Sequence, residues 1–227
     1  MDFGLSAEEW QAVRLSLVVA AQAVTMGLPL AILVSLLLRW PGLPGRTALN
    51  IFVHLPLVLP PVVVGWMLLI VFGIRGPIGQ ILNDWFGIRL VFTANGAALA
   101  CAVMSFPLMV RAIRLSLDSV DRGLEDAAST LGAKSVDRFF TVTLPLMAPG
   151  VVSGAITAYA ASLGEFGAVI TFASNVPGQT QTLPLAIFTA LQTPGGEEAA
   201  ARLSLISVAL AVAGLLFGEW VGKRLRP

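Results

Sequence analysis

The sequence is poor in the side chains that most catalytic and metal sites require. Among 227 residues it has one histidine, His54, and one cysteine, Cys101. This excludes a zinc site built from several histidines, and it excludes both an internal disulfide and a Cys-x-x-Cys site. Charged residues make up only 12% of the chain, about half the share of an ordinary soluble domain. The composition excludes a typical cytosolic enzyme, and the net charge of +1 gives no indication of nucleic-acid binding.

Apolar residues, in contrast, make up 56% of the chain and gather in long runs. A helix needs about 20 apolar residues to cross a hydrocarbon core of ~30 Å. We therefore predict an all-α polytopic membrane helix bundle, surrounded by lipid, that forms a single domain over residues 1–227. Five spans are expected, at about 15–38, 51–73, 91–110, 146–172 and 202–221. The run 183–191 is too short to span and is expected to lie near one membrane face, although a sixth crossing stays open.

The direction of the spans follows from the Lys and Arg residues, which favour cytoplasmic loops. Five alternating spans place ten of the fourteen in one set of loops and four in the other. The larger set is Arg39, Arg46, Arg111, Arg114, Arg122, Lys134, Arg138, Lys223, Arg224 and Arg226, and the smaller is Arg14, Arg75, Arg89 and Arg202. We expect the larger set in the cytoplasm, which places the N-terminus outside and the C-terminus inside. The first run is expected to be a span and not a cleaved signal peptide, because acidic residues precede it.

The longest predicted cytoplasmic loop, about 116–143, is rich in charged residues. We call it the coupling loop. Its apolar side chains recur at the spacing of one helix face, at Val120, Leu124, Ala127, Ala128 and Leu131. This face is narrow and rich in alanine, so it can approach another surface closely. Asp118 or Ser119 is expected to cap the start of the helix, and Gly132 to end it with a left-handed residue. Ser135 is expected to cap a second short helix that runs through Phe139 and Phe140.

The coupling loop resembles a known motif. Asp126-Ala127-Ala128-Ser129-Thr130-Leu131-Gly132, followed after nine residues by Val142-Thr143-Leu144-Pro145, is similar to the EAA loop of binding-protein-dependent ABC importer permeases. That pattern is E-A-A-x-x-x-G, nine residues, then I-x-L-P. Asp126 stands where glutamate is usual, and Val142 stands for isoleucine. The resemblance assigns coupling to a partner ATPase to Leu124, Glu125, Asp126, Ala127, Ala128, Leu131, Gly132, Leu144 and Pro145.

Further stretches extend the resemblance over nearly the whole chain. Residues 54–65, 104–114, 162–168 and 192–197 are similar to molybdate permease subunits in particular, with tungstate, sulfate and thiosulfate permeases as close relatives. The resemblance implies a type I ABC importer permease in the cell (inner) membrane. It also implies a second copy of the chain, a cytoplasmic ABC ATPase dimer and an extracytoplasmic oxyanion-binding protein. The choice between molybdate, tungstate and sulfate stays open.

The chain itself is not expected to be an enzyme. Gly132-Ala133-Lys134-Ser135 is not a phosphate loop, because Ala128 and Ala133 stand where the motif G-x-x-x-x-G-K-[ST] needs glycine. ATP is therefore expected to bind to the partner subunit. We expect no cofactor, no catalytic residue and no metal ligand in this chain. Because no Lys or Arg falls at mid-membrane depth, an oxyanion is expected to pass among neutral donors. Candidates are Asn95, Ser105, Ser162 and Thr171, for which helix packing is an equal alternative.

Two other classes of function compete with this prediction. An ion-coupled secondary transporter would need acids or histidines inside its spans and usually has inverted repeats. In the sequence only Glu165 and His54 qualify, and no inverted repeat is visible. Glu165 is expected instead to cap a helix break near Gly164, and His54 to make an ordinary hydrogen bond. An intramembrane enzyme would need a catalytic constellation, which one histidine and no paired aspartate in the spans cannot supply.

Overall fold

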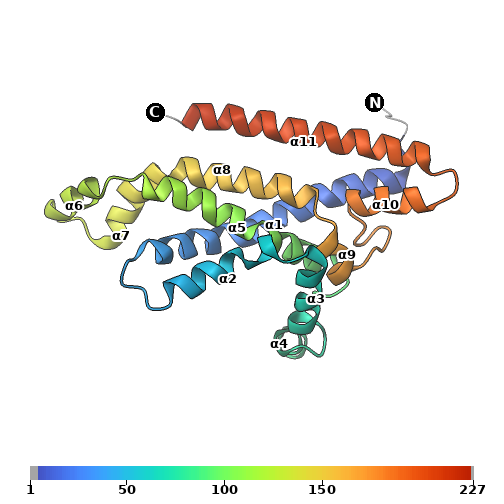
Figure 1. Ribbon diagram of the computed structural model, residues 1–227, viewed down its shortest axis with the longest axis horizontal. Helices are drawn as coiled ribbons and strands as arrows, with labels where there is room; N and C mark the ends of the chain where they lie inside the picture. The colour runs from blue at the N-terminus through green and yellow to red at the C-terminus, as the bar shows by residue number, and fades with distance from the viewer. Residues whose placement is uncertain (1–4, 226–227) are drawn as a thin grey trace.

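The computed structural model describes residues 5–225, apart from the side chains of Arg122, Leu215, Lys223 and Leu225. Within this range the chain is helical (Figure 1). In chain order the elements are α1 (Ala7–Arg39), α2 (Arg46–Val58), α3 (Pro61–Phe72), α4 (Pro77–Phe86), α5 (Ala94–Asp118), α6 (Arg122–Thr130), α7 (Ser135–Arg138), the π-helix η1 (Phe139–Thr143), α8 (Leu144–Leu163), α9 (Gly167–Ala173), α10 (Leu183–Gln192) and α11 (Glu197–Leu225). Arg226, one of the residues expected in the cytoplasm, lies outside the described residues.

The long helices α1, α5, α8 and α11 run along the long axis of the molecule (Figure 1). Helix α5 packs against both α1 and α8, and α11 packs against α8 and α10. Small residues make this close packing possible. Ala97, Ala98 and Cys101 of α5 are fully buried in the largest core cluster, and a Cβ added at Gly150 of α8 would overlap Ser116 of α5. The buried Cys101 is a small core residue, as expected from the sequence.

Four described helices are long and apolar enough to cross a membrane. They are α1, α5, the continuous helix Ser135–Leu163 and residues Glu197–Gly222 of α11. The pair α2 and α3 is a fifth candidate. The run expected to lie near one membrane face is α10, a helix of 10 residues that is shorter than a helical span needs.

The region 51–73, expected as one span, consists of two helices that differ in direction by 119°. The break falls at Leu59 and Pro60, which have extended backbone angles. Two consecutive prolines explain it, because each lacks an N–H donor and disfavours helical geometry in the residue before it. Helix α3 turns away from the bundle, packs against α9 and projects with α4 from one side (Figure 1).

The region 146–172 also differs from the expected single span. Its helix begins at Ser135, because α7, η1 and α8 follow one another without interruption, and it ends at Leu163. The chain then breaks at Gly164–Phe166 before the short helix α9. The Glu165 carboxylate accepts a hydrogen bond of 2.9 Å from the Ala168 N–H in the first turn of α9. The expectation that Glu165 caps a helix break near Gly164 is therefore confirmed.

Candidate functional site

The coupling loop forms one end of the molecule, where α6 and α7 lie beyond the long helices (Figure 1). Asp121 caps α6, because its Oδ1 accepts a hydrogen bond of 2.8 Å from the Gly123 N–H. The expectation that Asp118 or Ser119 caps this helix is wrong, since α5 continues through Asp118 and Ser119 is its C-terminal cap. The expectation that Ser135 caps the second short helix is also wrong, because Ser135 is the first residue of α7 and Lys134 is the N-terminal cap, without a side-chain hydrogen bond. Gly132 has φ +89°, the left-handed geometry expected where the helix ends.

The side chain of Glu125 connects α6 to two other helical elements through hydrogen bonds. Its Oε1 accepts a hydrogen bond of 2.9 Å from Nη1 of Arg39, at the end of α1. The same oxygen accepts a hydrogen bond of 2.6 Å from the hydroxyl of Thr143, the last residue of η1. Nη2 of Arg39 also donates to the carbonyl of Val120 at 3.3 Å. The side chains of Arg39 and Glu125 are only 15% and 19% exposed, so water screens this ion pair less than a surface pair.

Most apolar side chains of α6 and of its C-terminal end are exposed. Leu124 is 50% exposed and Leu131 is 89% exposed. Ala127 is exposed and Ala128 is half-buried. Val120, expected on the same face, instead precedes α6 and is buried. The remaining face of small and branched apolar side chains is open to a partner surface.

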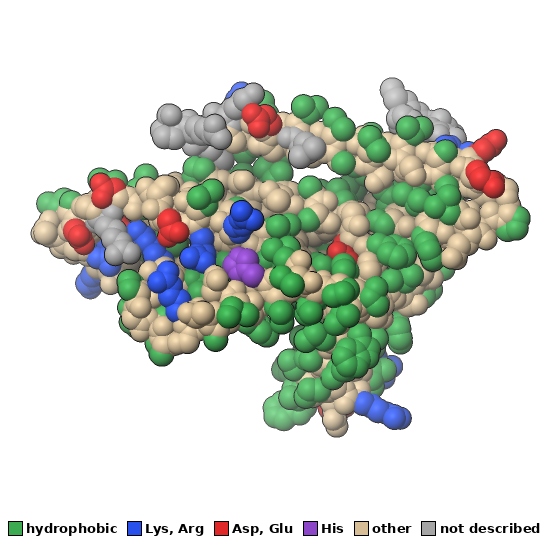
Figure 2. Space-filling model, viewed as in Figure 1, with side chains coloured by type: hydrophobic (Ala, Val, Ile, Leu, Met, Phe, Trp, Pro, Cys, Tyr) green, Lys and Arg blue, Asp and Glu red, His purple; other side chains and the backbone are tan. Residues whose placement is uncertain are grey.

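The other residues assigned to coupling lie nearby in the chain. Asp126 is exposed beside Glu125, and Pro145 is exposed in the first turn of α8, next to the half-buried Leu144. Lys and Arg side chains gather toward this end of the molecule, whereas the projecting α3–α4 segment is covered mostly by apolar side chains (Figure 2).

The four residues considered for a translocation path do not form one cluster of free donors. Ser105 is buried in α5 and its hydroxyl donates to Ala102 O at 3.5 Å. Thr171 donates to Gly167 O in its own helix at 2.8 Å. Asn95 is exposed near the start of α5. Ser162 differs, because its buried hydroxyl has no hydrogen-bond partner among the described residues.

Sequence reasoning missed the partners of Glu125. In the sequence Arg39 counts only among the charges expected in the cytoplasm, and Thr143 occupies only a variable position of the loop motif. Arg39 and Glu125 are 86 residues apart, so no local spacing relates them. The one histidine, His54, makes the expected ordinary contact, with Nδ1 at 2.8 Å from Asn50 O. No group of three His, Cys, Asp or Glu side chains suited to a metal ion occurs among the described residues.

The arrangement defines a multi-pass helical membrane protein with an anchored helical loop at one end. Residues 23–227 match the family described as binding-protein-dependent transport system inner membrane component, and the chain belongs to that family. It is therefore a multi-pass inner-membrane component of a binding-protein-dependent transport system, with the all-α fold of ABC importer permeases.

Two named permeases of the family are closely similar over nearly their full length. The chain is 57% identical over 219 residues to the molybdenum transport system permease protein ModB of Escherichia coli K12, which covers 96% of both chains. It is 51% identical over 218 residues to ModB of Haemophilus influenzae, covering 96% of this chain and 95% of the relative. The sulfate transport system permease protein CysT of Salmonella typhimurium is 37% identical over 215 residues, covering 89% of this chain and 76% of the relative.

Solved structures support the fold. A bacterial alginate ABC transporter, crystallised with a periplasmic protein that carries an alginate pentasaccharide, aligns with a TM-score of 0.76 at 16% identity, covering 98% of this chain and 81% of that chain. An amino acid ABC transporter crystallised with histidines aligns with a TM-score of 0.66 at 16% identity, covering 96% and 94%. At this identity the likeness concerns the fold alone.

Proposed function

We propose that the chain is the membrane-spanning permease subunit of an ATP-driven molybdate importer. The observation that carries the transport mechanism is the α6 face, which is open to a partner while Glu125 fixes its helix to α1 and η1. A partner that pushes on such a helix would move the long helices with it. The substrate is inferred from the ModB relatives, at 57% and 51% identity. Tungstate and sulfate or thiosulfate are the alternatives, and the sulfate permease relative at 37% identity supports keeping them.

The partner at the α6 face is proposed to be a cytoplasmic ABC ATPase dimer. The residues proposed to transmit its movement are Leu124, Glu125, Asp126, Ala127, Ala128, Leu131, Gly132, Leu144 and Pro145. Ala127 and Ala128 would allow close approach of the ATPase surface, and the exposed Leu124 and Leu131 would fill apolar depressions in it. ATP hydrolysis would occur in the ATPase and not in this chain.

A second copy of the chain and an extracytoplasmic oxyanion-binding protein complete the proposed complex. The projecting segment α3–α4 supports a dimer, because it carries several large apolar side chains away from its own bundle (Figures 1 and 2). Trp66 is 57% exposed and Ile70 is 50% exposed. Such surface within a membrane would face lipid or the same segment of another copy.

The proposed topology has five crossings. These are α1, the bent pair α2–α3, α5, the helix Ser135–Leu163 and α11, with the N-terminus outside and the C-terminus in the cytoplasm. The concentration of Lys and Arg toward the α6–α7 end (Figure 2) supports this direction. The oxyanion is proposed to pass neutral donors between the copies, and the unpartnered hydroxyl of the buried Ser162 is the strongest of the four candidates.

A reconstituted complex tests this proposal. The chain would be co-expressed with its ATPase, inserted into proteoliposomes, and supplied with binding protein outside and ATP inside. We expect ATP-dependent uptake of radioactive molybdate, with tungstate competing more strongly than sulfate. Uptake that proceeds without ATP but requires an ion gradient would overturn the proposal in favour of a secondary transporter. Preferential uptake of sulfate would overturn the choice of substrate while keeping the class.

A further inference from the structure

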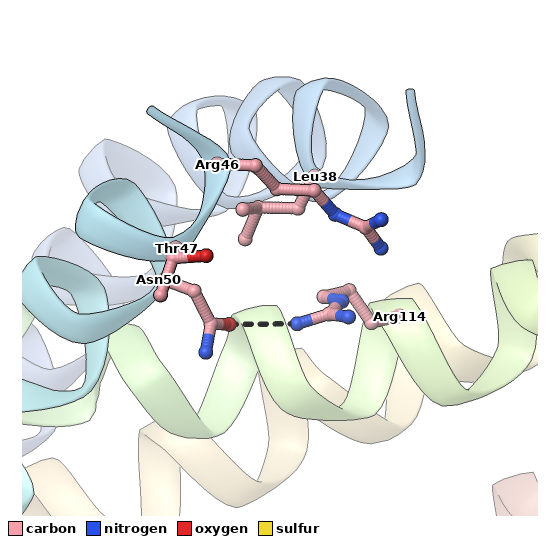
Figure 3. A pocket seen from close by; sticks show the side chains of 5 residues that line it. All are labelled: Leu38, Arg46, Thr47, Asn50 and Arg114. Carbon is pink, nitrogen blue, oxygen red and sulfur yellow. Dashed lines mark hydrogen bonds between the residues drawn. The ribbon is translucent and has the colours of Figure 1, made fainter. Parts of the chain in front are cut away.

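A small pocket opens where the start of α2 packs beside the end of α1 and the second half of α5 (Figure 3). Its volume is about 260 Å³, and it is lined by Leu38, Arg46, Thr47, Asn50 and Arg114. We call it the Arg46–Arg114 pocket. Leu38 is buried and forms an apolar wall, whereas the other four side chains are polar or charged. The pocket belongs neither to the α6 face nor to the residues proposed for the translocation path.

The lining of this pocket is positively charged. Its lining contains two guanidinium groups and no carboxylate. In the part of the chain that the structure describes, neither Arg46 nor Arg114 lies within 4.0 Å of an acidic side chain, in contrast to Arg39 and Arg202. Two like charges that share a depression repel each other, so an anion between them would be stabilised by both.

The pocket also presents several hydrogen-bond donors, and the position of one of them is fixed by a hydrogen bond. Nη1 of Arg114 donates to Oδ1 of Asn50 at 2.8 Å, which holds the guanidinium group in place across the gap between α5 and α2. Figure 3 shows the Arg46 guanidinium group above that of Arg114, the Thr47 hydroxyl on the opposite side of the pocket, and the Asn50 amide next to Arg114. The Asn50 amide nitrogen, not used in that hydrogen bond, is a further donor. The lining thus offers N–H and O–H donors and positive charge together.

We propose that the Arg46–Arg114 pocket binds a tetrahedral oxyanion group. Guanidinium groups bind such groups through paired hydrogen bonds, which adds geometric selectivity to charge attraction. The volume is below the roughly 300–1,000 Å³ typical of sites for drug-sized ligands, which favours a small ion or one headgroup over a larger organic molecule. The ligand is either a free ion such as molybdate, or the phosphate of an anionic lipid in the adjacent leaflet.

The location separates this pocket from the proposed path of neutral donors. Arg46 is the first residue of α2, and Arg114 lies in the last two turns of α5, close to Asp118 where that helix ends. In the proposed topology this is the cytoplasmic side, so the pocket would hold an oxyanion after passage or from the cytoplasm. Only this choice of side rests on the proposed function. Binding itself requires neither ATP, nor the binding protein, nor uptake.

The test measures binding to the full-length chain alone, in nanodiscs made of phosphatidylcholine. Sodium molybdate is titrated at low ionic strength into the parent and into R46Q, R114Q and R111Q. Arg111 is the matched control, because it is an exposed arginine of α5 one turn before Arg114 and does not line the pocket. We expect saturable binding that weakens at least tenfold in R46Q and R114Q and less than twofold in R111Q. R46Q is included because Arg46 takes no part in the hydrogen bond between Arg114 and Asn50. Weaker binding in R46Q therefore cannot result from loss of that contact between α5 and α2.

A second arm identifies the source of the oxyanion group. Nanodiscs that also contain phosphatidylglycerol are used, and the lipid retained by the chain is measured by native mass spectrometry. A lipid phosphate is supported as the ligand of the pocket if the parent and R111Q retain phosphatidylglycerol while R46Q and R114Q lose it. In that case phosphatidylglycerol should also suppress molybdate binding to the parent. Molybdate binding that phosphatidylglycerol leaves unchanged would support the free ion. Equal effects of all three substitutions, or no saturable ligand in either arm, would overturn the proposal.

Discussion

The guanidinium group of Arg39 and the carboxylate of Glu125 join two parts of the chain that are 86 residues apart, at a distance of 2.9 Å. Arg39 is the last residue of α1, and Glu125 lies in the middle of α6. Because Thr143 of η1 donates to the same Glu125 oxygen, one carboxylate connects the loop helix to the end of α1 and to the continuous helix Ser135–Leu163. A displacement of α6 would therefore be transmitted to both.

Replacing Glu125 with glutamine should loosen α6 without unfolding the bundle. The loss of a hydrogen bond to a charged group costs about 1.5–3 kcal/mol, and Arg39 would be left partly buried without its charged partner. We expect amide hydrogen exchange in residues 122–130 to become faster by about tenfold or more. Stimulation of the partner ATPase by loaded binding protein should fall in parallel.

Asp126→Asn is the control for this experiment. It removes the same charge from the neighbouring residue, but Asp126 is exposed, where an ion pair typically contributes only about 0.2–1 kcal/mol. Its effect on exchange should therefore be small. Equal acceleration in both variants would show that the charge of the loop matters and that the contact with Arg39 does not.

The orientation of the chain across the membrane can be determined by labelling single cysteines. After Cys101→Ala removes the one native thiol, a cysteine is introduced either as Glu8→Cys or as Pro227→Cys. Neither change alters the number of Lys and Arg residues, which set the orientation. An impermeant thiol reagent added to spheroplasts should label only Glu8→Cys. Labelling of Pro227→Cys alone would reverse the orientation, and labelling of both or neither would change the number of crossings.

The close contact of α8 with α5 should be sensitive to one added side chain. A Cβ at Gly150 would overlap Ser116 and approach the carbonyl of Ala112. Gly150→Val is therefore expected to destabilise the fold by about 1–3 kcal/mol through overpacking, measured by unfolding of the purified chain in mixed detergent micelles.

Gly214→Ala is the matched control, because no atom lies within 4 Å of the position of its added Cβ. Alanine in a helix is favoured over glycine by about 0.5–1 kcal/mol, so this variant should unfold at the same denaturant concentration or a slightly higher one. A stable Gly150→Val variant would contradict the helix packing described above.

The features that sequence could predict are those that depend on neighbouring residues. The uncharged runs predict where α1, α5 and α11 lie, the run 183–191 predicts the short helix α10, and Gly132 predicts the left-handed turn that ends the loop helix. The cap formed by Glu165 belongs to the same group, since it acts over three residues. Each of these follows from local length, composition or backbone geometry.

The features that sequence could not predict depend on direction or on contacts across the fold. The prolines at 60 and 61 indicate a helix start, but not that α3 turns by 119° from α2. Ser135 predicts a separate short helix through Phe139 and Phe140, yet η1 joins this helix to α8 without interruption. The Arg39–Glu125 contact and the Arg46–Arg114 pocket bring together residues of different helices, for which the sequence offers no spacing signal.

The central claim is that the α6 face is the surface on which the ATPase docks. Ala128→Trp would place a large ring where close approach requires a small side chain. Gly132→Val would put a β-branched residue at φ +89°, a backbone conformation that costs such residues of the order of 1–3 kcal/mol. Thr130→Trp is the matched control, because Thr130 is exposed on the same helix but off the apolar face.

The most direct measurement is ATP-dependent molybdate uptake and ATPase activity, recorded side by side on reconstituted complexes of the parent, Ala128→Trp and Thr130→Trp. Co-purification of the ATPase reports whether each complex assembles. The account predicts that Ala128→Trp loses most uptake and the stimulation of ATP hydrolysis by loaded binding protein, while its helices still insert and Thr130→Trp behaves like the parent. Assembly and transport by Ala128→Trp at the parent's rate would contradict the account.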